Sequence, residues 1–329
     1  MLKSRKLGQR GLEVSSIGLG CMGMSFAYGT PDDAESIATV HRALDLGCSF
    51  FDTAEIYGPY TNEDLLGRAL AGRRNEAMIA TKFGFRIENG KRVGNDSSPA
   101  QITRAVEGSL KRLQTDHIDL LFQHRLDRAV PIEEVAGAVS ELVRQGKVRY
   151  FGLSEVGVAT IRRAHAVHPV SALQSEYSLW ERNLEADVLP VLRELGIGLV
   201  PFSPLGRGFL TGTAKRADAY PQGDYRQRFE PRIQGENFDA NMRATAVVRD
   251  IAVRKGITPA QLSLAWLLAK GDDIVPIPGT KRRAYLEENL TADDVVLTTI
   301  EVRELDECLP PGSVAGPRYI EPMMADVER

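Results

Sequence analysis

The sequence has few of the features that mark secreted, metal-binding or membrane proteins. Its 329 residues include three cysteines, Cys21, Cys48 and Cys308. This odd number, without metal-ligand spacing, argues against a disulfide scaffold and against a zinc site. No apolar stretch approaches the length of a transmembrane helix, and no apolar run follows the basic N-terminal residues as in a signal peptide. We therefore expect a protein of the reducing cytoplasm without a membrane partner.

Net charge is nearly absent too. The chain carries 41 Lys and Arg against 44 Asp and Glu, a net charge of −3, which gives no reason to expect a nucleic-acid partner. Neither His165 nor His168 belongs to a cluster that would suggest a catalytic metal. The sequence does not indicate an oligomeric state.

The chain does contain a repeated alternation of strand and helix patterns. The first fourteen residues read as a short hairpin that turns at residues 8–11. Apolar runs followed by helical spacing then recur eight times, with strands expected at 16–20, 50–52, 78–82, 118–124, 148–153, 170–174, 197–202 and 274–277. Eight such units predict an α/β fold: one (β/α)8 TIM barrel over residues 1–329, with an N-terminal β-hairpin, two extra helices and long mouth loops.

Two segments interrupt the alternation. Residues 206–238 are polar and much longer than an ordinary βα loop, which leaves a functional flap or a disordered insertion. Because this segment leaves the C-terminal end of a barrel strand, where barrel enzymes carry their sites, we favour a loop that covers a bound cofactor. The tail, residues 310–329, is either a disordered end or a lid near the pocket.

Three successive strand-like runs end in ionisable residues, Asp52, Lys82 and His124, and Tyr57 follows the first of them. On neighbouring barrel strands these side chains would meet at one point. A phenol has a pKa of about 10, so a tyrosine that donates a proton needs a nearby ammonium, and a carboxylate to hold that ammonium. His124 could orient a carbonyl oxygen or relay the proton. A structural ion pair between Asp52 and Lys82 is the plainer alternative, but four converging groups favour a proton-handling site.

These residues lie in motifs that resemble the aldo-keto reductase superfamily over essentially the whole chain. The motifs occupy residues 51–58, 80–84, 122–124, 152–154, 201–206 and 277–279, and residues 173–180 further resemble the bacterial and plant branch that includes pyridoxal and perakine reductases. The resemblance implies NADPH-dependent reduction of a small aldehyde or ketone to an alcohol, with hydride from nicotinamide and a proton from Tyr57. Family members that reduce a conjugated double bond carry glutamate in place of His124, so carbonyl reduction is favoured.

The resemblance also implies a cofactor site and a substrate pocket. Ser154 and Gln174 would bind the nicotinamide carboxamide and Phe202 would stack on the ring, whereas the asparagine usual after the serine is replaced by Glu155, which can accept but not donate a hydrogen bond. The remaining cofactor contacts would come from Met22, Ser203, Leu205, Gly206, Arg207, Gly279, Lys281, Arg282, Glu288 and Asn289, with Lys281 and Arg282 at the 2′-phosphate. Met24, Tyr28 and Trp180 would form an adaptable pocket wall.

Two alternatives stay open because fold does not decide function. A Schiff-base lyase of barrel fold would use Lys82 as its nucleophile. A cofactor-binding regulatory subunit is the other, since the aldo-keto reductase fold also serves as an auxiliary subunit of potassium channels. The complete set of Asp52, Tyr57, Lys82 and His124 favours an enzyme that turns over.

Overall fold

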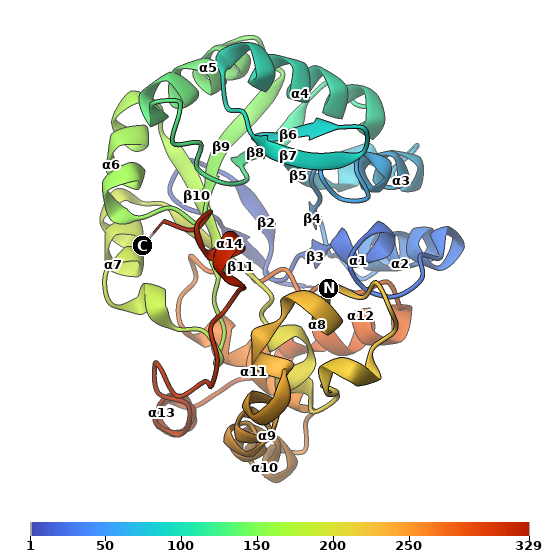
Figure 1. Ribbon diagram of the computed structural model, residues 1–329, viewed down its shortest axis with the longest axis vertical. Helices are drawn as coiled ribbons and strands as arrows, with labels where there is room; N and C mark the ends of the chain where they lie inside the picture. Colours follow the sequence, from blue (N-terminus) through green and yellow to red (C-terminus); the bar gives the residue numbers. More distant parts are fainter. Residues whose placement is uncertain (1, 329) are drawn as a thin grey trace.

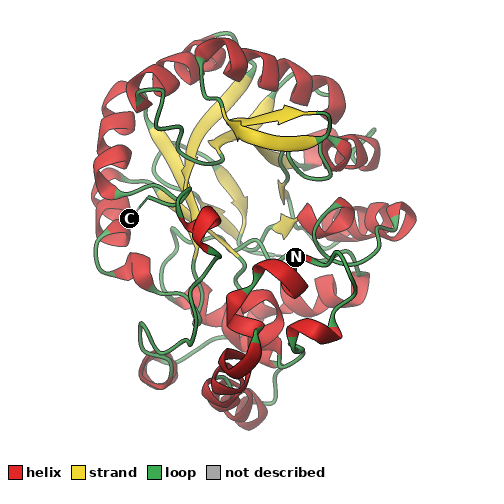
Figure 2. Cartoon of the chain, viewed as in Figure 1, coloured by secondary structure: helices red, strands yellow, loops and turns green. Residues whose placement is uncertain are grey.

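A ring of helices surrounds a barrel of parallel strands in the computed structural model, which describes residues 2–328 (Figures 1 and 2). Seven strands lie side by side, and every pair of neighbours is parallel. In their spatial order they are β3 (Leu19–Gly20), β4 (Phe50–Asp52), β5 (Met78–Phe83), β8 (Ile118–Gln123), β9 (Val148–Ser154), β10 (Val170–Glu176) and β11 (Gly198–Phe202). The predicted TIM barrel is thereby confirmed.

The predicted eighth strand closes the ring irregularly. On one side the Val275 N–H donates to the carbonyl oxygen of Leu199 at 2.9 Å, and on the other the Gly18 N–H donates to the carbonyl oxygen of Pro276 at 2.9 Å. Pro276 and Pro278 have no N–H and cannot donate to a ladder. The segment therefore makes only isolated bridges with its neighbours.

Helices cover the outside of the barrel and complete the strand–helix alternation. They are α1 (Met22–Ser25), α2 (Asp33–Asp45), α3 (Thr61–Ala69), α4 (Pro99–Leu113), α5 (Ile132–Arg144), α6 (Val158–Val167), α7 (Val188–Leu195), α11 (Pro259–Ala269) and α12 (Arg283–Leu290), with α10 (Ala246–Lys255) and α13 (Thr299–Cys308) as extra helices. Their apolar faces pack on the strands in two clusters of buried side chains. Among residues 2–328, no helix has both the length and the apolarity needed to cross a bilayer.

The interior of the barrel is a third apolar cluster, closed at the N-terminal ends of the strands by a hairpin. Strands β1 (Ser4–Lys6) and β2 (Glu13–Ser15) pair antiparallel, as predicted, and Leu7 and Leu12 between them are fully buried in the interior. Gly8 turns the hairpin with φ of 75°, and a Cβ there would lie 2.7 Å from the carbonyl oxygen of Ser171. Only glycine fits this position, and the open end of the barrel is the opposite one.

Three segments frame that open end, the mouth. An antiparallel hairpin of β6 (Phe85–Glu88) and β7 (Lys91–Asn95) follows β5. The predicted cover loop after β11 forms short helices, including α8 (Tyr225–Phe229) and the start of α9 (Gly235–Ala244). The tail contains α14 (Glu321–Met324), drawn in red in front of the strand ends in Figure 1, and is tied to the β6–β7 hairpin by an ion pair between Arg92 and Asp326 at 2.8 Å.

Candidate active site

The mouth brings the four predicted catalytic side chains together. Asp52 is the last residue of β4, Lys82 lies in the neighbouring strand β5, and His124 follows β8, the next strand along. Tyr57 lies in the turn between β4 and α3. The exposed fraction is 1% for Lys82, 3% for Asp52 and 8% for both Tyr57 and His124. The cluster is therefore buried at the end of the barrel interior.

The ammonium of Lys82 organises the cluster. Its Nζ lies 2.6 Å from Oδ1 of Asp52, 2.8 Å from the carbonyl oxygen of Thr53 and 3.2 Å from the phenol oxygen of Tyr57. A lysine ammonium has three donors and no acceptor, so these partners use all of its protons. Because the Tyr57 oxygen accepts from Lys82, the proton of its own hydroxyl is left for another acceptor.

The electrostatics fix the protonation states of Lys82 and Tyr57. Burial lowers the pKa of Lys82, but Asp52 and Tyr57 outweigh it and leave the pKa above its usual value, so the amine stays an ammonium. Burial and the Asp52 carboxylate raise the pKa of Tyr57, against the opposing charges of Lys82 and Arg125. Tyr57 is thus held as a neutral phenol, the form that can donate a proton.

His124 is a neutral imidazole in this setting. Burial lowers its pKa well below the usual value, and the nearby cations Lys82, Arg125 and Arg92 lower it further. Its ring lies edge-on to that of Tyr57, with centroids 5.9 Å apart, and its buried Nδ1 has no hydrogen-bond partner within the part of the chain that the structure describes. A neutral imidazole keeps one N–H, which can donate a hydrogen bond to a carbonyl oxygen without adding a positive charge beside Lys82.

Gln174 adds a contact to the cluster that the sequence did not predict. Its Nε2 donates to Oδ2 of Asp52 at 2.7 Å, so Asp52 is held by Lys82 on one oxygen and by Gln174 on the other. The amide oxygen of Gln174 accepts no hydrogen bond from residues 2–328. It is therefore free to accept from the carboxamide nitrogen of a nicotinamide.

Glu55 is a buried carboxyl group close to this site. It is 3% exposed, its Oε1 has no hydrogen-bond partner among the described residues, and burial together with Glu63 raises its pKa to about 8. An unfolded glutamate has a pKa of about 4.3. The folded state thus keeps a proton that the unfolded chain loses, and the stability this gives is full below about pH 4 and lost as the pH rises through about 8.

A Glu55→Gln variant should remove this pH dependence. Near pH 4 its melting temperature should be close to that of the unsubstituted protein, whereas near pH 9 it should be higher by several degrees, because the unsubstituted protein then carries a buried charge at Glu55. Thermal unfolding followed by circular dichroism across this range measures the difference, with the exposed Glu307→Gln as control for loss of a carboxylate. Parallel pH profiles for the Glu55 variant and the unsubstituted protein would contradict the assignment.

The carboxylate of Glu155 is already bound by the tail and by strand β10. Its carboxylate pairs with Arg318 of the tail and accepts from the Ser175 hydroxyl at 2.7 Å and the Glu176 N–H at 2.8 Å. Although burial raises its pKa, Arg318 and Arg125 outweigh this and hold the pKa below its usual value. Glu155 therefore anchors the tail to the mouth, while its neighbour Ser154 stays beside the cluster.

Arg207 does not face outward as a counter-charge for pyrophosphate. Its guanidinium lies 3.1 Å from Glu176 and 2.7 Å from Glu230, both buried carboxylates, and 3.3 Å from the hydroxyl of Tyr319 in the tail. Its backbone is left-handed, with φ of 53°. This leaves the backbone around Gly206 and Gly208, rather than the Arg207 side chain, as the part of the loop suited to a phosphate.

The basic run at α12 divides into three different roles. Lys281 donates to the carbonyl oxygens of Tyr28 and Thr30 at 2.7 and 2.6 Å, and Arg283 pairs with Glu35 at 3.0 Å. Arg282, at the N-cap of α12, is exposed and has no carboxylate partner among residues 2–328. Of the three cations, Arg282 is the one open to a phosphate.

The other predicted residues vary in exposure. Met22, Phe202, Ser203, Leu205 and Glu288 are half-buried at or near the mouth, Gly206 and Asn289 are buried, and Gly279 bridges to Gly20. Of the predicted pocket wall, Tyr28 lies edge-on to Tyr225, but Met24 is 1% exposed within the core and Trp180 is covered by Phe209, their ring centroids 4.4 Å apart. Met24 and Trp180 thus do not face an open pocket in this structure.

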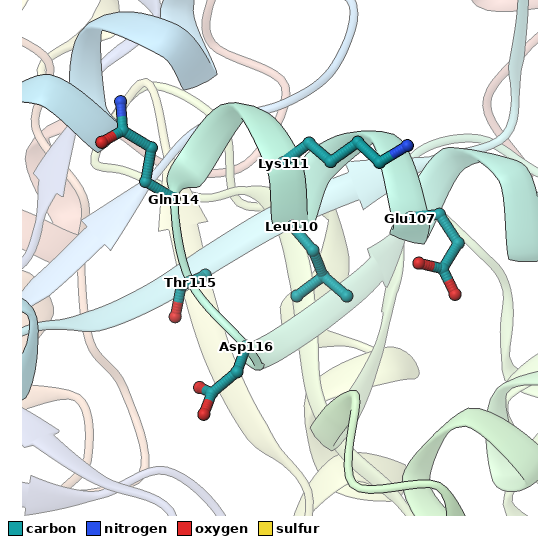
Figure 3. A pocket seen from close by; sticks show the side chains of 6 residues that line it. All are labelled: Glu107, Leu110, Lys111, Gln114, Thr115 and Asp116. Carbon is teal, nitrogen blue, oxygen red and sulfur yellow. The ribbon is translucent and has the colours of Figure 1, made fainter.

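A shallow hollow lies beside the end of α4, at the N-terminal end of β8 and so at the opposite end of the barrel (Figure 3); it is lined by Glu107, Leu110, Lys111, Gln114, Thr115 and Asp116. Within residues 2–328, no group of three or more His, Cys, Asp or Glu side chains is arranged to hold a metal ion. The cluster around Lys82 is the best candidate for an active site.

Known proteins resemble the chain over nearly its full length. Residues 16–310 match the model of the aldo/keto reductase family. The chain is 45% identical over 316 residues to "Probable aldo-keto reductase 1" of Glycine max, covering 95% of this chain and 91% of that protein. The solved glycerol dehydrogenase AKR11B4 from Gluconobacter oxydans has a TM-score of 0.85 at 30% identity, covering 95% and 97% of the two chains. The aldo-keto reductase AKR11C1 from Bacillus halodurans, in its holo form, has a TM-score of 0.76 at 29% identity, covering 94% and 97%.

Proposed function

Because the chain belongs to the aldo/keto reductase family, we propose that it reduces an aldehyde or ketone to an alcohol with NADPH, with Tyr57 as the proton donor. The observation that carries the proposal is the buried ammonium of Lys82, within hydrogen-bonding distance of both Asp52 and the Tyr57 hydroxyl. General acid catalysis needs the donor in its protonated form and within reach of the acceptor. The neutral phenol of Tyr57 at the barrel mouth meets the first requirement.

Each side chain of the cluster has its own role in the proposed reaction. Reduced nicotinamide, when bound, supplies a hydride to the carbonyl carbon. Tyr57 gives its hydroxyl proton to the carbonyl oxygen, and the resulting tyrosinate is stabilised by the ammonium of Lys82. Asp52 holds Lys82 in place and is itself held by Gln174. His124, as a neutral imidazole, orients the carbonyl oxygen.

The residues around the mouth fit a nicotinamide dinucleotide phosphate. Gln174 has a free amide oxygen for the carboxamide, Ser154 lies beside it on the neighbouring strand, and Phe202 is half-buried at the end of β11. Arg282, open at the start of α12, suits the 2′-phosphate, which NADH lacks. AKR11C1, one of the similar structures, is described as a holo form, which supports a bound cofactor in this fold.

Replacing Arg282 by alanine should raise the KM for NADPH by about 10- to 100-fold, the loss expected for charge-assisted hydrogen bonds to a phosphate. The kcat/KM with NADH should stay nearly unchanged. Steady-state kinetics with both cofactors measures this. Arg283→Ala is the matched control, because Arg283 is already paired with Glu35 and its loss should have a smaller effect. Equal losses with NADPH and NADH would remove Arg282 from the 2′-phosphate site.

A Schiff-base lyase is the less favoured alternative. Lys82 is paired with Asp52 and its pKa is raised, so it is a protonated amine and a poor nucleophile.

A panel of an aryl aldehyde, a dicarbonyl, pyridoxal and a ketosteroid tests the proposed reduction, which is followed by the loss of NADPH absorbance. No oxidation of NADPH with any of them, together with trapping of a carbonyl compound on Lys82 by borohydride, would favour the lyase. The predicted cytoplasmic location stays a prediction.

A further inference from the structure

Arg125 follows His124 at the C-terminal end of β8 and is half-buried. One nitrogen of its guanidinium, Nη1, donates to the carbonyl oxygen of His124 at 2.7 Å and lies 3.2 Å from the hydroxyl oxygen of Ser154. Its Nε and Nη2 make no hydrogen bond with residues 2–328. Arg125 is thus held beside the cluster by Nη1, and the other two nitrogens of its guanidinium are available as donors.

Five other arginines around the mouth each have a carboxylate partner. The pairs are Arg92 with Asp326, Arg207 with Glu176, Arg226 with Asp224, Arg232 with Glu181, and Arg318 with Glu155. Arg125 forms no ion pair within residues 2–328. Because its Nε and Nη2 donors are unused, the guanidinium can bind an anion brought by a ligand.

Arg125 is the cation next to the cluster whose charge no ion pair balances within residues 2–328. Lys82 is balanced by Asp52, and His124 is neutral. Glu155 interacts with Arg125, but its carboxylate is already paired with Arg318. Glu176 is likewise held by Arg207 at 3.1 Å, so Arg125 is left without a carboxylate of its own among the described residues. A carboxylate entering here would be attracted and could bind the planar fork in a bidentate way.

Arg125 lies next to the side chains that would act on the substrate carbonyl. It is adjacent in sequence to His124, and its charge acts on the Tyr57 phenol. The ring of Phe85 packs on that of His124 with centroids 4.7 Å apart and adds an aromatic group beside the cluster. A substrate with a short apolar or aromatic spacer between its carbonyl and its carboxylate could place the carbonyl at Tyr57 and the carboxylate at Arg125.

We propose that Arg125 is a specificity-determining residue that binds a substrate carboxylate, so that the enzyme prefers carbonyl compounds bearing a carboxylate. This inference rests on the reductase function proposed above. It names a substrate class, a formyl or oxo acid, for the site built around Tyr57. No bond forms at Arg125, which only binds the anion and orients the carbonyl.

A matched pair of substrates tests the proposal. Para-formylbenzoate and its methyl ester differ in charge but share the aldehyde and the ring. The ratio of kcat/KM for the acid to that for the ester is the readout, because it does not depend on the concentration of folded enzyme. The unsubstituted enzyme should favour the acid. Arg125→Gln should lower the ratio by about 10- to 100-fold, and Arg125→Lys should lower it less, since it keeps the charge but not the fork.

Arg92→Gln provides the control, because it removes a mouth cation that already has a carboxylate partner, Asp326. Its ratio should stay within about twofold of that of the unsubstituted enzyme if the effect belongs to the open fork rather than to the general field. An unchanged ratio in Arg125→Gln, or an equal fall in Arg92→Gln, overturns the proposal. Reduction of both substrates without preference overturns it while leaving the reductase function intact. Reduction of neither substrate, nor of any compound in the wider panel, overturns the reductase function and this inference with it.

Discussion

Replacing Tyr57 by phenylalanine is expected to lower kcat for carbonyl reduction by about 10²- to 10⁴-fold, the contribution typical of a positioned general acid. The substitution removes only the hydroxyl that accepts from Lys82 at 3.2 Å. The ring that lies edge-on to His124 remains. Single-turnover reduction, followed by the loss of NADPH absorbance, isolates the chemical step from substrate binding and product release.

Cofactor binding provides the control for this variant. Quenching of protein fluorescence by NADPH should give a Kd within about twofold of that of the unsubstituted protein, since the hydroxyl serves the transition state rather than the cofactor. Activity in Tyr57→Phe equal to that of the unsubstituted protein would exclude Tyr57 as the proton donor. Loss of cofactor binding together with activity would instead indicate that Tyr57 shapes the cofactor site.

Replacing Lys82 by methionine should have two large effects at once. The variant leaves the carboxylate of Asp52, 3% exposed, without its cation, and breaking a buried ion pair in this way costs about 3 to 5 kcal/mol of stability. It also removes the ammonium that stabilises the tyrosinate, so kcat should fall by about 10²- to 10⁴-fold. Denaturant unfolding measures the first effect and single-turnover kinetics at saturating NADPH the second.

A double variant separates the structural role of Lys82 from its chemical role. Combining Lys82→Met with Asp52→Asn removes both charges and should recover part of the lost stability, but not the activity. If the pair were only structural, activity per folded molecule would be retained in both variants. Arg74→Met with Arg149→Met is the matched control, because together they remove both arginine partners of buried Asp119 at the opposite end of the barrel; this variant should lower stability without lowering kcat.

The sequence predicts best what is encoded locally. Asp52, Lys82 and His124 stand at the ends of apolar runs that form adjacent strands, so their convergence follows once the strands are recognised. The β6–β7 hairpin also had a local signal that our sequence analysis did not use: Asn89 and Gly90, with φ of 49° and 71°, have the positive φ values typical of a tight hairpin turn. The eighth strand was predicted from its apolar residues, and its prolines explain why it forms bridges rather than a ladder.

Contacts between distant parts of the chain left no such signal. Gln174 reaches Asp52 across 122 residues, and Glu155 meets Arg318 across 163. Both contacts depend on closure of the barrel and on the path of the tail, which no spacing within one element encodes. The same applies to Arg207, whose sequence position suggested a phosphate contact but whose side chain is bound by buried carboxylates.

Glu155 and Arg318 are far apart in the sequence, but because they are paired we expect them to vary together among relatives. Glu155 is left-handed, with φ of 58°, a conformation that asparagine, the residue usual here in aldo-keto reductases, adopts more readily. Because a buried carboxylate without its cation costs several kcal/mol, a lineage that gained the glutamate first would have been selected for a compensating arginine. Among relatives the two residues should therefore be gained and lost together, and chains that keep asparagine should be free to vary at the position of Arg318.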